Sequence, residues 1–243
     1  MTPSATPTPT NTATATNTPT PTSTATATFT PTPLADLIFS NGFESGNLSA
    51  WSSSVTDSGD LSVTAAAAVG GSFGLQALID NNGAIYVVDN APTAEARYRA
   101  RFYFDPNTIT MSNGNSHYIL YGYSGTTLVV IRVEFRRSSS QYQLRAQILT
   151  DGNSWQSTAW FTITDAPHAV EINWQASTAV GANNGNLTFW IDGVQRASLV
   201  NVDNDTHRIE TIRLGALAGV DSGTRGTYYF DTFESRRVNY IGP

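Results

Sequence analysis

The sequence contains no cysteine and no lysine, and these two absences limit what the chain can do. Without cysteine there are no disulfides, no thiolate metal sites and no cysteine nucleophiles. All 13 basic residues are arginine and stand against 19 acidic residues, so the formal net charge is -6. A chain with that balance lacks the basic surface that neutralises phosphates, and we do not expect a nucleic acid partner.

Long apolar runs are also absent. No run approaches the ~18 residues of a membrane span, and Met1 is not followed by a basic and then apolar export signal. With 243 residues, 40% of them hydrophobic, the chain can still bury a substantial core. Only 13% of the residues are charged, about half the usual share. The composition predicts a β protein with a polar surface and no membrane span.

Residues 1–33 form a low-complexity segment with a period of two. Seven of the 11 prolines lie here, and proline excludes both a helix and a central strand. We therefore predict an extended arm or linker at 1–33, followed by one domain at 34–243. In an extended chain, alternate side chains lie on one side, and Thr/Pro-rich segments suit O-glycosylation. A bare spacer is the plainer alternative. The predicted acceptors are Thr6, Thr8, Thr10, Thr12, Thr14, Thr16, Thr18, Thr20, Thr22, Thr24, Thr26, Thr28, Thr30 and Thr32.

From residue 34 onward the sequence consists of short alternating runs separated by Gly, Asn, Ser and Asp. Apolar residues recur at every second position, which is typical of strands with one buried face. No segment longer than a turn or two has a helical period. We predict an all-β fold, a two-sheet antiparallel β-sandwich (jelly roll). The expected strands are 35–39, 61–66, 73–78, 84–89, 94–104, 117–123, 127–136, 141–149, 158–163, 169–175, 186–191, 195–200, 209–214 and 227–235.

Several motifs support a jelly roll more directly. The run GNLTFWIDGV at 185–194 resembles the "L-x-L-W/Y-V-D-G" hairpin of concanavalin-A-like and laminin-G-like domains. The opening NGFESGNLSAW at 41–51 is similar to the start of bacterial extracellular carbohydrate-binding jelly rolls. The resemblance implies the fold. It leaves the function open, because such sandwiches serve as lectins, adhesins, spacers and hydrolases.

Catalytic motifs are missing from the sequence. Laminarinase-type hydrolases on this fold carry E-x-D-x-x-E on one strand, which directs its carboxylates at one sugar bond. None of the six glutamates begins such a motif. The three histidines, His117, His168 and His207, are scattered and are expected to be polar loop or strand-end residues. We therefore expect no enzymatic activity.

Calcium is the metal that the composition favours, because oxygen ligands are plentiful and thiols are absent. The resemblance implies a structural ion held by Glu44, Asp231 and a backbone carbonyl near Gly71. Asp203 and Asp205 form a second, weaker candidate in an oxygen-rich loop. The alternative for both places is an exposed turn, or a carboxylate held by backbone amides.

Polar faces of three predicted strands offer a binding surface. Guanidinium groups and amides on a rigid sheet can hold sugar hydroxyls, uronates, sulfates or another subunit. If the strands at 94–104, 127–136 and 141–149 pair in sequence order, their polar side chains share one face. A solvated face with cross-strand ion pairs is the alternative. Trp155, in the turn at 151–155, is the expected exposed platform for stacking on a sugar ring. The other candidates are Arg97, Arg99, Arg101, Tyr103, Arg132 and Arg145.

The leading functional hypothesis is a non-catalytic extracellular or cell-surface protein, structural or adhesive. In it the glycosylated arm mediates self-association into a filament or layer. A carbohydrate-binding module tethered by a linker is the alternative, and a polysaccharide-cleaving enzyme is the second alternative. The expected partners are other copies of the chain and glycans.

Overall fold

The computed structural model describes residues 1–5 and 35–243. The chain divides into two units, Met1–Leu34 and Ala35–Pro243. Residues 1–5 are exposed and have no regular secondary structure. The second unit contains 17 strands and two short 3₁₀ helices, η1 (Asp57–Gly59) and η2 (Ala65–Ala67). Across the part of the chain so described, no helix is long and apolar enough to cross a membrane.

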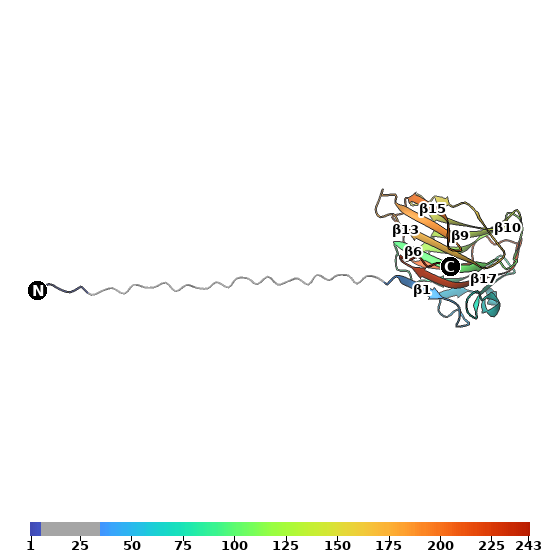
Figure 1. The fold of residues 1–243 in the computed structure, drawn as a ribbon, viewed down its shortest axis with the longest axis horizontal. Coiled ribbons are helices and arrows are strands. Elements are labelled where there is room, and N and C mark those ends of the chain that lie inside the picture. The colour runs from blue at the N-terminus through green and yellow to red at the C-terminus, as the bar shows by residue number, and fades with distance from the viewer. Residues whose placement is uncertain (6–34) are drawn as a thin grey trace. The chain divides into compact units, whose positions relative to one another are not determined.

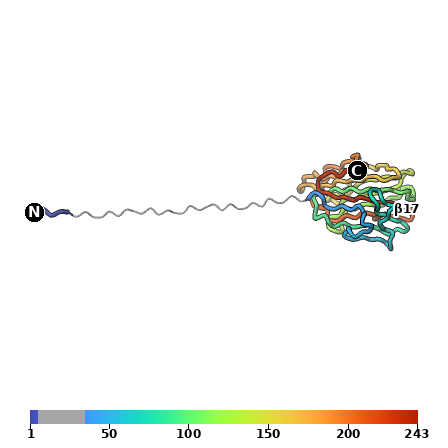
Figure 2. Tube along the Cα trace, turned by 60° about the horizontal axis from the view of Figure 1, so that its bottom comes forward, coloured from blue at the N-terminus to red at the C-terminus, as the bar shows by residue number. Residues whose placement is uncertain are grey.

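The strands form two antiparallel sheets (Figure 1). Sheet A has nine strands. Seven of them follow one another in a single order, and β1 (Leu37–Asn41) and β7 (Thr110–Met111) each pair with one of these seven, β17 (Thr224–Arg236), outside that order. Because β1 pairs with β17, the first and last strands of the unit lie side by side (Figure 2). The main path of sheet A runs through β15 (Val194–Val202), β14 (Gly185–Ile191), β13 (His168–Gln175), β6 (Arg97–Asp105), β17 (Thr224–Arg236), β4 (Gly74–Ile79) and β3 (Leu61–Thr64).

Sheet B has eight strands, and β12 (Phe161–Ile163) pairs with β10 beside its main path. Its central strands are long, with nine residues in β8, eleven in β9 and nine in β10. The main path runs through β11 (Trp155–Ser157), β10 (Gln141–Leu149), β9 (Leu128–Ser138), β8 (Ser116–Ser124), β16 (Thr211–Ala216), β5 (Ile85–Asp89) and β2 (Ser53–Val55).

The predicted all-β sandwich is confirmed, and each of the fourteen expected runs overlaps a strand. The strands that the sequence did not predict are β2, β7 and β11, of two or three residues each. Segments this short hold too few alternating positions to show a period of two.

The core lies between the two sheets and follows the predicted alternation. On β6 the side chains of Tyr98, Phe102 and Phe104 are fully buried, as are those of Val133 and Phe135 on β9. The two strands meet across the sandwich, where the ring centroids of Phe104 and Phe135 are 4.9 Å apart. Because these buried side chains fill the space between the sheets, the polar residues that alternate with them along each strand are directed outward.

His117 departs from its expected polar setting. It lies near the start of β8, as a strand-end residue should, but its ring is fully buried. The ring stacks on Tyr228, with centroids 5.6 Å apart, and Nε2 is 3.2 Å from the Tyr228 hydroxyl. Burial lowers the pKa of His117 from 6.5 to about 4, and attraction to Asp221 opposes part of that shift. The imidazole is therefore a neutral member of the core.

Candidate functional site

Three of the predicted binding residues, Arg132, Arg145 and Trp155, lie together on the outer face of sheet B, among other polar and aromatic side chains. On β9, Ile131, Val133 and Phe135 are fully buried, so the residues that alternate with them face away from the core. The same holds for the residues that alternate with Leu144, Ala146 and Ile148 on β10. We call this surface the arginine–aromatic face. Its members are Tyr118, Tyr121, Arg132, Glu134, Arg136, Gln143, Arg145, Gln147, Trp155, Trp160 and Arg213.

Guanidinium groups on this face stack on aromatic rings. Arg132 lies over Trp155, with Cζ 3.7 Å from the ring centroid, and over Tyr118 at 4.7 Å. Arg136 and Arg145 share Trp160, at 3.9 and 4.4 Å. Each such contact stabilises a partly exposed cation by roughly 0.5–2 kcal/mol and fixes the plane of the group. The result is a set of arginines held in place by a rigid sheet.

A second set of stacked residues continues the face toward β5. Cζ of Arg213 lies 4.8 Å from the ring centroid of Tyr86 and 4.6 Å from that of Tyr123. Arg213 is also the cross-strand neighbour of Tyr121. Aromatic and cationic side chains therefore extend across four adjacent strands, β10, β9, β8 and β16, and reach β5.

Two glutamine side chains accept hydrogen bonds from the arginines of the face. Gln147 accepts from Nε of Arg132 at 2.6 Å, and its amide donates to the Ser157 hydroxyl. Gln143 accepts from Nε of Arg136 at 2.7 Å. Gln147 is only 2% exposed, and the amide of Gln143 also donates to the Thr162 hydroxyl. The glutamines are therefore used within the face, where they fix the orientation of the arginines.

The titratable groups of the face are one carboxylate in an ion pair and two phenols with raised pKa values. Glu134 is the one carboxylate on the described strands β8, β9 and β10, and it pairs with Arg145 at 2.7 Å. Burial raises the pKa of Tyr118 and Tyr121, so both phenols keep their protons.

The expectation that three strands share one face is wrong. β6 lies in sheet A between β13 and β17, whereas β9 and β10 are neighbours in sheet B. The physical reason is that β6 and β9 oppose each other across the core, so their polar sides are directed away from each other. The residues that the structure places on the other sheet are Arg97, Arg99, Arg101 and Tyr103.

On sheet A these arginines are held in ion pairs or lie partly buried. Arg99 is 7% exposed, its Nη1 lies 2.6 Å from the Glu171 carboxylate, and Trp190 and Tyr240 cover its guanidinium. Arg101 donates to the Thr232 carbonyl. Amides of the C-terminal residues Ile241 and Gly242 also donate to Glu171. This part of sheet A is covered by residues 240–242.

The structure brings Glu44, Asp231 and Gly71 to one loop, as the resemblance implies. Oδ2 of Asp231 accepts the amides of Val69 and Gly70, each at 2.8 Å. The Glu44 carboxylate accepts the amides of Ser72 and Phe73. Gly71 has φ +81°, and a Cβ there would overlap that carboxylate. Both acids accept backbone amides in this arrangement, which is the alternative expected for this place, and the calcium ion stays a prediction.

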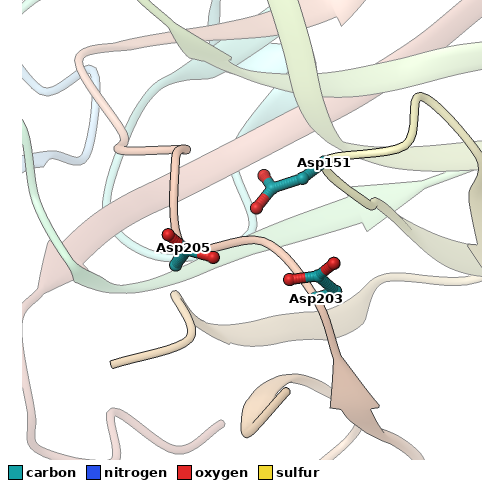
Figure 3. A group of neighbouring side chains, drawn as sticks. All are labelled: Asp151, Asp203 and Asp205. Carbon is teal, nitrogen blue, oxygen red and sulfur yellow. The ribbon is translucent and has the colours of Figure 1, made fainter. Parts of the chain in front are cut away.

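At the second predicted metal site, a third carboxylate lies beside those of Asp203 and Asp205. Oxygens of Asp203 and Asp205 lie within 4.8 Å of one another and of an oxygen of Asp151, which follows β10 (Figure 3). Asp151 also accepts the Thr206 hydroxyl. Desolvation and repulsion from Asp151 and Asp203 raise the pKa of Asp205. Sequence reasoning missed Asp151, because it is more than fifty positions away in the chain.

The remaining predicted platform, Trp155, is the first residue of β11 and is partly buried under Arg132. Tyr118, Tyr121 and Arg213 were not predicted as site residues. Tyr118 and Tyr121 lie on either side of a bulge on β8, which breaks the period of two. A regular alternation would have placed one of them in the core, so the sequence alone gave no signal for both.

Two hollows of the unit lie apart from the stacked arginines. One, of about 500 Å³, is lined by Thr108, Arg137, Ser140, Gln141, Tyr142, Thr162, Ile163, Thr164 and Asp165. The other, of about 460 Å³, lies beside Glu44 and Glu234. Neither includes Arg132, Arg136, Trp155 or Trp160.

No family model and no curated protein matches the sequence. Among solved structures, the chain is similar to the cellulose-induced protein Cip1, with a TM-score of 0.61, 16% identity, and 84% of this chain and 99% of that chain covered. It is similar to the alginate lyase Aly36B, with a TM-score of 0.55, 10% identity, and 86% and 95% covered. At such low identity the likeness shows a β-sandwich of the lectin and jelly-roll type.

A third similar structure is the binding domain of Paraclostridial Mosquitocidal Protein 1, with a TM-score of 0.57 and 12% identity. The match covers 85% of this chain and 50% of that domain, so this chain spans half the length of the similar structure.

Proposed function

We propose that this chain is a non-catalytic carbohydrate-binding protein that works outside the cell, and that the arginine–aromatic face holds an extended glycan. The observation that carries the proposal is the stacking of Arg132 on Trp155 and of Arg136 and Arg145 on Trp160, on one open sheet face. Rigid aromatic and guanidinium groups of this kind bind with little loss of side-chain entropy. The names of two structures similar in fold, a cellulose-induced protein and an alginate lyase, are also tied to polysaccharides.

Binding without cleavage is supported by the state of the face. Its central carboxylate, Glu134, is already paired with Arg145, and the phenols of Tyr118 and Tyr121 have raised pKa values. A general base works best when its pKa lies near the operating pH. These groups are therefore better suited to hold a sugar chain than to break it.

The test is a titration of the folded protein with a panel of soluble neutral and acidic polysaccharides, followed by calorimetry and by an assay for released sugar ends. Trp155→Ala and Trp160→Ala should each weaken binding about tenfold, which corresponds to ~1.4 kcal/mol. Trp190→Ala is the matched control, because Trp190 packs against Tyr240 on the outer face of sheet A. No binding to any polymer, or an equal loss in the control, would count against the proposal, and released ends would favour an enzyme.

The assembly hypothesis concerns a different part of the chain. Its arm and its glycosylation acceptors, the threonines at even positions from Thr6 to Thr32, lie outside the described residues. Self-association through a glycosylated arm therefore stays a prediction. It is compatible with glycan binding by the sandwich, because the two use different segments.

A further inference from the structure

Two arginines of the arginine–aromatic face share the same setting. Arg132 donates through Nε to Gln147 and stacks on Trp155, while Arg136 donates through Nε to Gln143 and stacks on Trp160. In each case a glutamine of β10 holds the inner edge of the guanidinium and an indole ring covers its plane. The sheet therefore presents the same unit twice along β9.

Neither of these arginines has an anionic partner. Within residues 1–5 and 35–243, no carboxylate lies within ion-pair distance of Arg132 or Arg136, and their terminal nitrogens have no protein acceptor. Arg145, between them on the next strand, is paired with Glu134. The chain has 19 acidic residues, so carboxylates are available. Glu134 lies between them on β9, so Arg132, Arg136 and Arg145 share one carboxylate, and a face with this excess of positive charge is complementary to an anionic ligand.

The free edge of each guanidinium suits one chemical class. With Nε occupied, the two terminal nitrogens still present parallel N–H donors, the geometry that binds carboxylate or sulfate oxygens in pairs. Burial lowers the pKa of Arg132 and Arg136. An arginine nonetheless stays protonated in proteins, so both positions keep their charge.

Resting on the proposed function, we propose that the glycan is an acidic polysaccharide, and that Arg132 and Arg136 each bind an anionic group on a different residue of one sugar chain. The two arginines are four positions apart on β9, which is about 14 Å at the rise of an antiparallel strand. That separation exceeds one sugar residue, so a polymer can reach both arginines and a monosaccharide cannot. Arg213, stacked on Tyr86 and Tyr123, lies further along the same face.

The experiment compares matched pairs of polymers: polygalacturonate with its carboxyl-reduced form, and dextran sulfate with dextran. Each is titrated into the full chain and into the Arg132→Gln and Arg136→Gln variants. Arg196→Gln, on the exposed edge strand β15, removes the same charge from a place off the face. Gln147→Glu gives Arg132 a carboxylate partner of the kind that Arg145 has, without deleting the arginine.

We expect the anionic member of at least one pair to bind about tenfold more tightly than the neutral member. Both arginine variants and Gln147→Glu should remove that preference, Arg196→Gln should keep it, and thermal unfolding should show that all variants fold. Preference for polygalacturonate identifies a uronate ligand, and preference for dextran sulfate identifies a sulfated one.

Three results would overturn the inference. Equal binding of charged and neutral polymers, lost in Trp155→Ala, would leave the proposed function standing with a neutral ligand. An equal loss in Arg196→Gln would show unspecific attraction of a polyanion. Absence of binding to all four polymers and to the wider neutral and acidic panel would remove both proposals.

Discussion

The buried imidazole of His117 leads to a quantitative prediction about pH. In the unfolded chain this group takes up a proton near pH 6.5, whereas in the folded chain it does so only near pH 4. The free energy of unfolding should therefore fall as the pH is lowered through this window. Below pH 4 the stability that the neutral imidazole contributes is fully lost. A shift of 2.5 pKa units corresponds to about 3 kcal/mol, and between pH 7 and 4.5 the loss is about 2.5 kcal/mol.

The variant that isolates this effect is His117→Gln. Glutamine does not titrate, and its side-chain amide can still form a hydrogen bond with the Tyr228 hydroxyl, which lies 3.2 Å from Nε2 in the wild type. The free energies of unfolding of the two proteins are measured by urea denaturation at pH 7 and at pH 4.5. Since all other titrating groups are the same in both proteins, the difference between their pH dependences belongs to His117.

The comparison with a variant is needed because Asp89 acts in the opposite direction. Burial raises the pKa of Asp89 to about 6, so its contribution stabilises the fold as the pH falls. The wild-type profile alone would show a partial cancellation of the two groups. If the wild type and His117→Gln lose stability in parallel between pH 7 and 4.5, the account of a neutral core histidine is wrong.

The remaining predictions concern charged groups away from the arginine–aromatic face. Asp89→Asn should stabilise the protein at pH 7 by at most about 3 kcal/mol and should have little effect below pH 4, measured by urea unfolding. Arg99→Ala leaves the buried Glu171 carboxylate without its cation, so it should lower the free energy of unfolding by about 3–5 kcal/mol. Glycan affinity should be unchanged. Millimolar calcium should raise the melting temperature of the wild type, chelator should reverse it, and Asp205→Asn should abolish the response if the cluster with Asp203 is the calcium site.

The sequence predicted the fold because the signals for it are local. Alternation along β9 and β10 assigns Val133, Phe135 and Leu144 to one side, and all three are fully buried. The outward residues follow from the same period. A strand of nine or eleven residues contains enough alternating positions to make this assignment secure.

The site was predicted only in part, because strand order is a long-range property. Nothing between residues 94 and 149 says that β6 pairs with β13 and β17 while β9 and β10 pair with each other. The register of β6 with β13 and β17 then decides which carboxylates approach Arg99 and Arg101. Long-range pairing also brings Asp151 to Asp203, and it buries His117 against Tyr228, which lies 111 positions away.

For several arginines of this sandwich, the residue opposite in the sheet decides whether the charge is paired within the fold. Arg101 of β6 lies opposite Glu171 and Glu234, and Arg145 of β10 lies opposite Glu134. Both are therefore neutralised by carboxylates within the fold.

Arg132 and Arg136 lie opposite Gln147 and Gln143, which accept one hydrogen bond each and carry no charge. A glutamine at that register position accepts a hydrogen bond from the guanidinium, as a glutamate would, yet it brings no negative charge to the arginine. On β9 and β10 the same strand geometry thus gives an ion-paired arginine where a glutamate is opposite and an arginine without an ion pair where a glutamine is opposite.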